Sequence, residues 1–339
     1  MDVTTEFNDN SHSNTYQELY NTSFDSYNNL GKNLVQALEI LLTNHKIRFL
    51  TIYYRVKELD SFLDKIDRKA YTDPFEELED FCGIRIICYY QSDIGKIRDI
   101  VKNELFVTES KDKEASLDYD QFGYRSHHII AHIDESWTKV PNYRDLKGKK
   151  AEIQIRSVLM HAWAEIEHNL AYKKEAHIPE QFRRKLHLIS AMLEVADEQF
   201  ENLKKESKEY QEQMLIEAKN NVAKFEDDAS FNIDSLQALL DILFPDAKKS
   251  IENTSRLFDE MQQYDITLKD LKKAYDKVNP HFQDIMDDLY KIVPYRFVSQ
   301  AASARIMLDL IFPRFYKRKP ERDIRKQPTF NKWVEIVNR

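Results

Sequence analysis

The chain has 339 residues, of which 42% are hydrophobic and 32% charged, and its formal net charge at pH 7 is −8. These values are typical of a globular protein with room for two domains, and the negative charge excludes indiscriminate nucleic-acid binding by the whole molecule. Only 5 Gly and 9 Pro interrupt the long apolar-periodic runs, which indicates a large helical content.

The two cysteines, Cys82 and Cys88, fall in one predicted strand, where about 20 Å would separate them, too far for a disulfide. The first residues lack the basic and apolar regions of a signal peptide, and no apolar run reaches membrane-spanning length. We therefore expect a cytoplasmic protein without a membrane segment.

The N-terminal part predicts a disordered segment over residues 1–14 and then an amphipathic helix that ends near Ile47. The segment 52–69 follows as a strand that leads into a helix, and it gathers five cations. In the helix, Ser61, Lys65 and Arg68 fall three and four residues apart, on one side. Taken alone, this pattern favours a solvated face that pairs with nearby acids. The five cations are Arg55, Lys57, Lys65, Arg68 and Lys69.

The segment 80–90 is a second predicted strand, opened by Asp80 and Gly83, with Arg85 as a charge in an otherwise apolar run. A glycine inside a strand is typical of a close approach by a ligand or another backbone. A short helix over 94–105 and a charged loop over 109–121 are expected next.

A third strand is expected from about His127, just after a glycine corner. At that corner Tyr124 and Arg125 follow Gly123, and an aromatic beside a cation suits stacking on a base and holding a phosphate. His128 lies in the strand, where a lone histidine is more often structural than catalytic.

The segment 150–172 predicts a strand that runs straight into a helix. In the strand Ala151, Ile153 and Ile155 would share one face, and the other face would be polar, with Glu152, Gln154 and Arg156. The alternative is that this polar row is only the solvated face of an ordinary sheet.

Ser157 is the predicted N-cap of the helix that follows. We expect a buried apolar stripe that includes Trp163 and Ile166. At 100° per residue, Glu167 would lie half-buried at the border of the stripe, and Glu165 would be exposed near the far side.

Asp80 and Glu152 come from neighbouring strand ends, and two such carboxylates together with substrate phosphates are what a Mg²⁺ site needs. The cations of residues 55–69 would then hold the rest of a triphosphate. The sequence contains no HExxH, Walker, GxGxxG or paired CxxC motif, which removes the usual zinc, P-loop and dinucleotide interpretations.

Residues 30–175 resemble the synthetase domain of RelA/SpoT-type alarmone synthetases, above all the small, single-function members. The stretches that carry the resemblance, in the family's order, are YRVK, DFCGIRI, FGYRSHH, AEIQIRS and AWAEIEHNLAYK. The resemblance implies an α+β protein whose mixed-sheet, nucleotidyltransferase-like synthetase domain we place at 15–178. It also implies Mg²⁺-dependent transfer of a pyrophosphoryl group from ATP to the ribose 3′-hydroxyl of GDP or GTP, which gives (p)ppGpp and AMP.

The resemblance further implies roles for single residues. Asp80 and Glu152 would hold Mg²⁺, and Glu152 would also accept the proton of the attacking hydroxyl. The residues expected to bind ATP are Arg55 and Arg85 at the adenine and Lys57, Ser61, Lys65 and Arg68 at the phosphates. The residues expected to bind the acceptor are Tyr124, stacked on guanine, Glu167, which would read the guanine edge, and Arg125, His128, Gln154 and His161.

The sequence departs from the family pattern at two positions, which leaves the acceptor preference in doubt. Tyr54 stands where a small residue often precedes the Arg of the RVK stretch, and His161 stands where small synthetases often have Asn. No His-Asp hydrolase motif precedes the synthetase region, so degradation of the product is not expected.

The C-terminal half predicts an all-α domain over 179–312 and a basic tail over 313–339, in which nine basic and three acidic residues follow from Arg314 onward. Thr267 is a predicted N-cap. From Pro179 onward an apolar seam packs within the chain or against a second copy in a homo-oligomer.

Two alternative functions remain open. One is a toxin-type enzyme that pyrophosphorylates the 3′ CCA end of tRNA, with the basic tail and residues 183–185 (Arg-Arg-Lys) as the tRNA contact. The other is a non-enzymatic nucleotide sensor.

Overall fold

The structure is a computed structural model that describes residues 6–71, 73–112, 126–170, 180–222, 225, 230–291, 299–316 and 328–339. The chain divides into two compact units, Met1–Leu203 and Lys204–Arg339, which we call the N-terminal unit and the helical unit. The division falls inside helix α6 (Glu180–Asn220), whereas the sequence predicts a domain boundary where that helix begins.

The N-terminal unit is built on a five-stranded sheet in the order β1-β2-β5-β4-β3. Strands β2 and β5 are parallel and the other neighbouring pairs are antiparallel, so the sheet is mixed, and the predicted α+β class is confirmed. The strands are β1 (Phe49–Val56), β2 (Cys82–Cys88), β3 (Leu105–Asp112), β4 (His127–Ile133) and β5 (Lys150–Ser157). Both cysteines are free and buried in β2.

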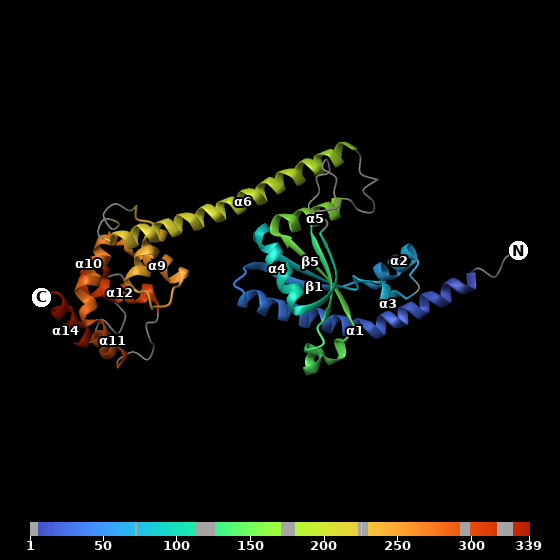
Figure 1. The fold of residues 1–339 in the computed structure, drawn as a ribbon, viewed down its shortest axis with the longest axis horizontal. Helices are drawn as coiled ribbons and strands as arrows, with labels where there is room; N and C mark the ends of the chain where they lie inside the picture. Colours follow the sequence, from blue (N-terminus) through green and yellow to red (C-terminus); the bar gives the residue numbers. More distant parts are fainter. Residues whose placement is uncertain are drawn as a thin grey trace. The chain divides into compact units, whose positions relative to one another are not determined.

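One face of the sheet is apolar and is covered by helices. The alternating residues Ile84 and Ile86 of β2 and Ile153 and Ile155 of β5 are fully buried in one hydrophobic cluster. Helix α1 (Glu6–Asn44) and helix α4 (Gln91–Glu104) pack on this side, beside the strands in Figure 1. Because α1 begins at Glu6, it includes part of the segment that we expected to be disordered.

Helix α2 (Leu59–Lys69) is held by an aromatic cluster, and this fixes the direction of its cationic side. Phe62 packs edge-on against Phe81, with ring centroids 5.3 Å apart, and Tyr20 of α1 donates to the backbone carbonyl of Lys57 at 3.1 Å. The helix ends at Ala70, which adopts the left-handed conformation with φ of 52°. The predicted strand-to-helix unit is therefore present, and the short helix α3 (Pro74–Glu77) leads from it towards β2.

Strand β3 corrects one expectation. Residues 109–112, predicted as the start of a charged loop, continue β3 and pair with β4. The polar, charged sequence hid a strand at the edge of the sheet, where side chains on one face meet solvent. The rest of that predicted loop lies outside the described residues. Two 3₁₀ helices, Trp137–Lys139 and Pro141–Leu146, join β4 to β5.

Ser157 joins three elements at the end of β5. Its Oγ accepts from the backbone N–H of Met160 at 3.1 Å, so it caps α5 (Val158–Leu170) as predicted. The same hydroxyl donates to Asp197 of α6 at 2.5 Å, and both residues are buried. Glu201 of α6 also accepts from the N–H of Ser92 at 3.1 Å, so this part of α6 is anchored beside β5 and α4.

The helical unit is all-α, as predicted. Helix α12 lies at its centre and is almost entirely buried (Figure 1). Thr267 is the N-cap of α10, in a capping box with Asp270. The helices that follow α6 are α8 (Ile233–Leu243), α9 (Ile251–Gln263), α10 (Leu268–Val278), the 3₁₀ turn Asn279–His281, α11 (Phe282–Tyr290), α12 (Gln300–Ile311), α13 (Pro313–Tyr316) and α14 (Pro328–Val337).

The described part of the predicted basic tail is not a free tail. Phe315 of α13 and Phe330, Trp333 and Val337 of α14 are buried in the hydrophobic core of the helical unit. The spacing of three and four residues between the last three is the helical signal that the high positive charge of the region concealed. Residues 317–327, which hold most of the cations, lie outside the described residues.

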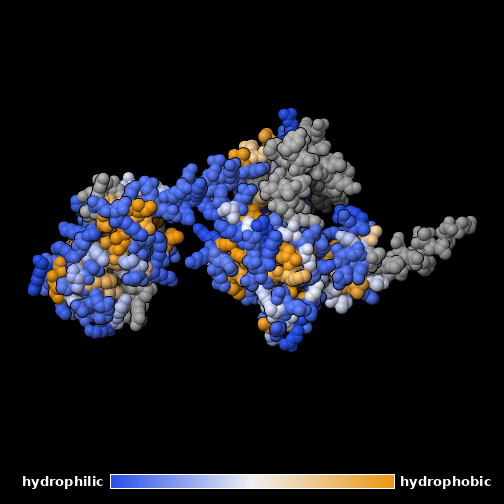
Figure 2. All heavy atoms as spheres, in the orientation of Figure 1, coloured by the Kyte–Doolittle hydropathy of each residue, from blue (hydrophilic) through white to orange (hydrophobic). Residues whose placement is uncertain are grey.

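Figure 2 shows apolar side chains among the hydrophilic surface of both units. On α6 the exposed side chains include Ile189, Phe200 and Leu203 of the predicted seam, whereas Ser190 and Asp197 are buried. Part of the predicted apolar seam is therefore not covered by the described chain. Within the described ranges, no helix combines the length and the hydropathy needed to cross a bilayer.

Candidate active site

Two rows of side chains cross the face of the sheet opposite to α1 and α4. Directly paired residues of neighbouring strands point to the same face, so the register of the ladders defines the rows. The first row runs over four strands: Tyr53, Arg85, Gln154 and His128. The second row is Arg55, Gly83 and Glu152, followed by Ile130.

A pocket of about 280 Å³ opens over these rows. Both carboxylates of the predicted metal site line it, together with most of the residues expected to bind ATP. The polar row of β5 is therefore part of a pocket and not merely the solvated face of a sheet. The lining residues are Tyr53, Arg55, Lys57, Ser61, Asp80, Gly83, Arg85, Glu152, Gln154 and His168.

Gly83 keeps the middle of the second row open. It lies between Arg55 and Glu152, and a Cβ placed on it would meet only the carbonyl oxygen of Arg55, at an ordinary 3.8 Å. The backbone therefore tolerates a side chain at this position. Glycine leaves this floor of the pocket free for a ligand, as expected for a glycine inside a strand.

Asp80 has one oxygen bound to lysines and one without a partner. Its Oδ2 lies 3.1 Å from Lys57 Nζ and 2.8 Å from Lys65 Nζ. Its Oδ1 is buried and has no hydrogen-bond partner among the described residues. A buried carboxylate oxygen without a partner is costly unless a ligand or an ion satisfies it. Oδ1 of Asp80 is therefore suited to be a ligand atom of the predicted Mg²⁺ site.

Glu152 is held by its neighbours through both oxygens. Oε1 lies 2.6 Å from Nδ1 of His128, and Oε2 accepts from the amide of Gln154 at 3.0 Å. His128 Nε2 lies 2.5 Å from Ser126 Oγ, and Gln154 accepts from Arg156 at 2.8 Å. The result is a continuous chain of hydrogen bonds that fixes the direction of the Glu152 carboxylate.

Arg85 is held by two partners through a single nitrogen. Its NH1 donates to Tyr53 Oη at 3.1 Å and to Glu165 Oε1 at 2.6 Å. Burial alone would lower the pKa of Arg85, but the bonds and charges of Tyr53 and Glu165 outweigh it and raise the pKa above the usual value. Arg85 is thus a firmly cationic group at the edge of the pocket.

The predicted exposures of two acids on α5 were wrong. Glu167 is exposed, whereas Glu165 is the residue turned towards the sheet. The helix buries Met160 and Trp163 but leaves Ile166 exposed, so its buried face is rotated from the expected stripe. The acceptor-binding role of Glu167 stays a prediction.

The remaining predicted residues are placed as follows. Arg68 is exposed on the last turn of α2 and does not line this pocket. The ring of His161 faces Tyr53 at 6.1 Å between centroids, its Nδ1 lies 3.8 Å from Glu165 Oε1, and it also does not line the pocket. Tyr124 and Arg125 lie outside the described residues, as does the side chain of Arg183, whereas Arg184 and Lys185 are exposed.

Three residues of the site were missed by the sequence analysis. Tyr53 precedes Arg55 by two residues in β1, so the strand alternation already placed it on the same face. Glu165 and His168 follow His161 by four and seven residues, which is the signature of one helix face. The error in the helix rotation concealed that signal.

Comparisons with known proteins show which family the chain resembles. A family profile described as "Region found in RelA / SpoT proteins" matches residues 54–177. The chain is similar to GTP pyrophosphokinase YjbM of Bacillus subtilis (strain 168), with 31% identity over 163 residues, which cover 46% of this chain and 72% of the relative. It is also similar to GTP pyrophosphokinase YwaC of the same strain, with 32% identity over 156 residues, 45% of this chain and 72% of the relative. Among solved structures, the small alarmone synthetase 1 from Bacillus subtilis is 26% identical, with a TM-score of 0.48 over 57% of this chain and 98% of that one.

Proposed function

We propose a reaction for this pocket from one premise: the chain belongs to the RelA/SpoT family. We infer that it is a GTP pyrophosphokinase, the activity named for both curated relatives. In detail, the enzyme transfers a pyrophosphoryl group from ATP to the ribose 3′-hydroxyl of GDP or GTP and releases AMP.

ATP binds on the side of β1, α2 and β2. Arg55 and Arg85 come from adjacent strands and lie in successive rows of the sheet, and both line the pocket. A planar guanidinium stacks well on an aromatic base, so these two arginines hold the adenine. Lys57 and Lys65 are already gathered at Asp80, and they bind the phosphates of ATP.

The acceptor binds on the side of β5 and β4. Glu152 lies in the row next to Gln154 and His128, and its carboxylate is aimed by both of them. It accepts the proton of the 3′-hydroxyl as the hydroxyl oxygen forms a bond to the β-phosphorus of ATP. The bond between the β-phosphorus and the oxygen bridging to the α-phosphorus breaks, and AMP leaves with that oxygen.

Asp80 and Glu152 are the residues that would hold Mg²⁺, and the unpartnered Oδ1 of Asp80 supports this assignment. When bound, the ion neutralises charge on the phosphates of ATP. Lys57 and Lys65 share this task from the protein side, because their bonds to Asp80 hold two positive charges at the same place.

The observation that carries the proposal is that one pocket is lined by both carboxylates and by the cations of β1 and β2. The test is incubation of the full chain with ATP, Mg²⁺ and either GDP or GTP, followed by separation of the nucleotides. We expect AMP and a guanosine nucleotide with a new 3′-pyrophosphate in equal amounts. Formation of ADP or inorganic phosphate instead would assign the pocket to another phosphoryl transfer.

A further inference from the structure

We propose that Glu165 is a positioning residue of the ATP side of the pocket: its carboxylate, together with the Tyr53 hydroxyl, holds the guanidinium of Arg85 in the orientation that stacks on adenine. This inference rests on the proposed function, and it assigns a role to a residue of α5 that lies outside the pocket lining.

The geometry of the contact favours positioning. Both partners bind one nitrogen, NH1, at 2.6 Å for Glu165 and 3.1 Å for Tyr53. Hydrogen bonds to a guanidinium lie near its plane, so these two bonds do not block the flat faces of Arg85, whose guanidinium carbon lies over the Tyr53 ring at 5.8 Å from the ring centroid. The long side chain of Arg85 would otherwise sample several rotamers, and a ligand would have to select one of them.

The charges around Glu165 favour the same role. Burial lowers the pKa of Arg156, and the positive charge of Arg85 lowers it further, whereas the carboxylate of Glu165 raises it. Burial also lowers the pKa of His161, and so do the positive charges of Arg156 and Arg85, whereas the carboxylate of Glu165 raises it. Glu165 is therefore a counter-ion shared by a cluster of basic side chains, and it offsets the repulsion between Arg85 and Arg156.

The ion pair is partly exposed, with 31% of the Arg85 side chain and 45% of the Glu165 side chain accessible to solvent. Such a pair contributes little to overall stability. Its effect is expected in binding, because Arg85 lines the pocket and Glu165 fixes it from the neighbouring helix. Glu165→Gln keeps the shape of the side chain and removes only its charge.

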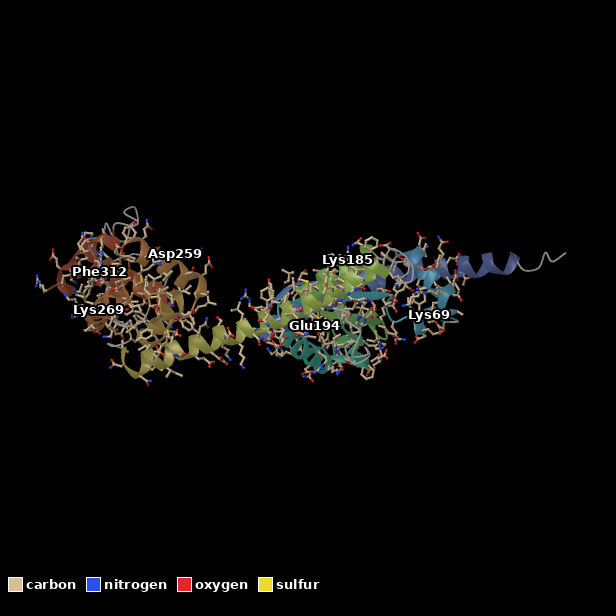
Figure 3. All side chains as sticks on the ribbon, turned by 90° about the horizontal axis from the view of Figure 1, so that it is seen from above. Lys69, Lys185, Glu194, Asp259, Lys269 and Phe312 are labelled. Carbon is tan, nitrogen blue, oxygen red and sulfur yellow. The ribbon has the colours of Figure 1, made fainter. Side chains whose placement is uncertain are left out.

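The experiment measures the dissociation constant of the α,β-methylene analogue of ATP, which cannot release AMP, for the full chain with Mg²⁺. We expect Glu165→Gln to weaken binding about fivefold, the effect of one partly exposed ion pair. The matched control is Glu194→Gln, the same change on an exposed position of α6 (Figure 3), which should bind the analogue as the wild type does.

A double-mutant cycle separates positioning from general damage. If Glu165 acts through Arg85, Glu165→Gln has no further effect in the Arg85→Ala background, and Tyr53→Phe weakens binding only when Arg85 is present. Equal or tighter binding by Glu165→Gln, or equal losses in both backgrounds, would overturn the inference. A wild type that does not bind the analogue would instead contradict the proposed function itself.

Discussion

Nδ1 of His128 lies 2.6 Å from Oε1 of Glu152, across the ladder between β4 and β5. An ionised carboxylate only accepts hydrogen bonds, so His128 donates from Nδ1, and in the neutral ring Nε2 accepts from the hydroxyl of Ser126. The order Ser126, His128, Glu152 is that of a base oriented by a second group, which is itself held by a third.

His128→Ala should lower kcat by about 10- to 100-fold, as removal of a group that orients a catalytic side chain does. His128→Asn, whose amide can still donate to Glu152, should recover part of the loss. Steady-state rates of AMP formation check this, with the KM for ATP as the internal control. The contrary result is an equal loss in both variants that comes from a higher KM for the acceptor, with kcat unchanged. His128 would then bind the acceptor and not orient Glu152.

Gly83→Ala should leave the fold intact and impair the pocket. The added Cβ has ordinary space, so the free energy of unfolding should change by less than about 0.5 kcal/mol. The methyl group would occupy space between Arg55 and Glu152 that is left to the ligand, which should weaken ATP binding about tenfold. Thermal unfolding and the KM for ATP measure the two effects.

Gly95 provides the control for this substitution. It lies inside α4, and a Cβ on it meets nothing within 4 Å. Gly95→Ala should therefore stabilise the chain by about 0.5–1 kcal/mol, because alanine loses less conformational freedom in a helix, and the activity should not change. Normal ATP binding by Gly83→Ala would show that the second row is not the floor of the ATP site.

Removal of the metal should abolish the reaction and reveal the role of Asp80. EDTA should stop AMP formation, and added Mg²⁺ should restore it in the wild type. Asp80→Asn should lose activity by about 100-fold or more at any Mg²⁺ concentration, because the asparagine oxygen lacks the charge that binds the ion. If excess Mg²⁺ restores the rate of Asp80→Asn fully, Asp80 only pairs with Lys57 and Lys65.

Strand β5, which carries Glu152 and Gln154, could be predicted from the sequence because its side chains alternate with a clear period of two. Ile153 and Ile155 point into the core, and Glu152 and Gln154 therefore had to share the opposite face. The sequence also predicted Asp80 and the cations of residues 55–69 around one triphosphate, but it did not predict the ion pairs of Asp80 with Lys57 and Lys65, since those contacts depend on strand order. No local pattern specifies that β1 and β5 flank β2.

The errors arose where two physical signals competed. In α5, Trp163 and Ile166 outline an apolar stripe, yet the helix starts directly at the end of β5 and buries Met160 beside Trp163 while Ile166 is exposed, which brings Glu165 to Arg85. In the segment 313–339, the high positive charge led us to predict a basic tail, although the spacing of Phe330, Trp333 and Val337 is helical and all three are in the core. Tertiary packing decided both cases, and a single sequence does not contain it.

Ser157→Ala should destabilise the N-terminal unit by about 2 kcal/mol, because it removes a helix cap and a hydrogen bond to a buried carboxylate. Asp197 is only 3% exposed, so loss of this bond is not offset by water. Chemical denaturation followed by circular dichroism measures the change. Asp197→Asn keeps an acceptor for the hydroxyl and should cost less; equal losses in the two variants would mean that the charge of Asp197 matters more than its bond to Ser157.

The most direct test of the account is the rate of AMP formation by Glu152→Gln at saturating ATP, GTP and Mg²⁺, with binding of the α,β-methylene analogue of ATP measured on the same protein. The account predicts a folded variant that still binds the analogue through the arginines and lysines of the ATP side but turns over about 100- to 10,000-fold more slowly, the usual contribution of a general base. Turnover at the wild-type rate would show that another group removes the proton, and the role assigned to Glu152 would then be wrong.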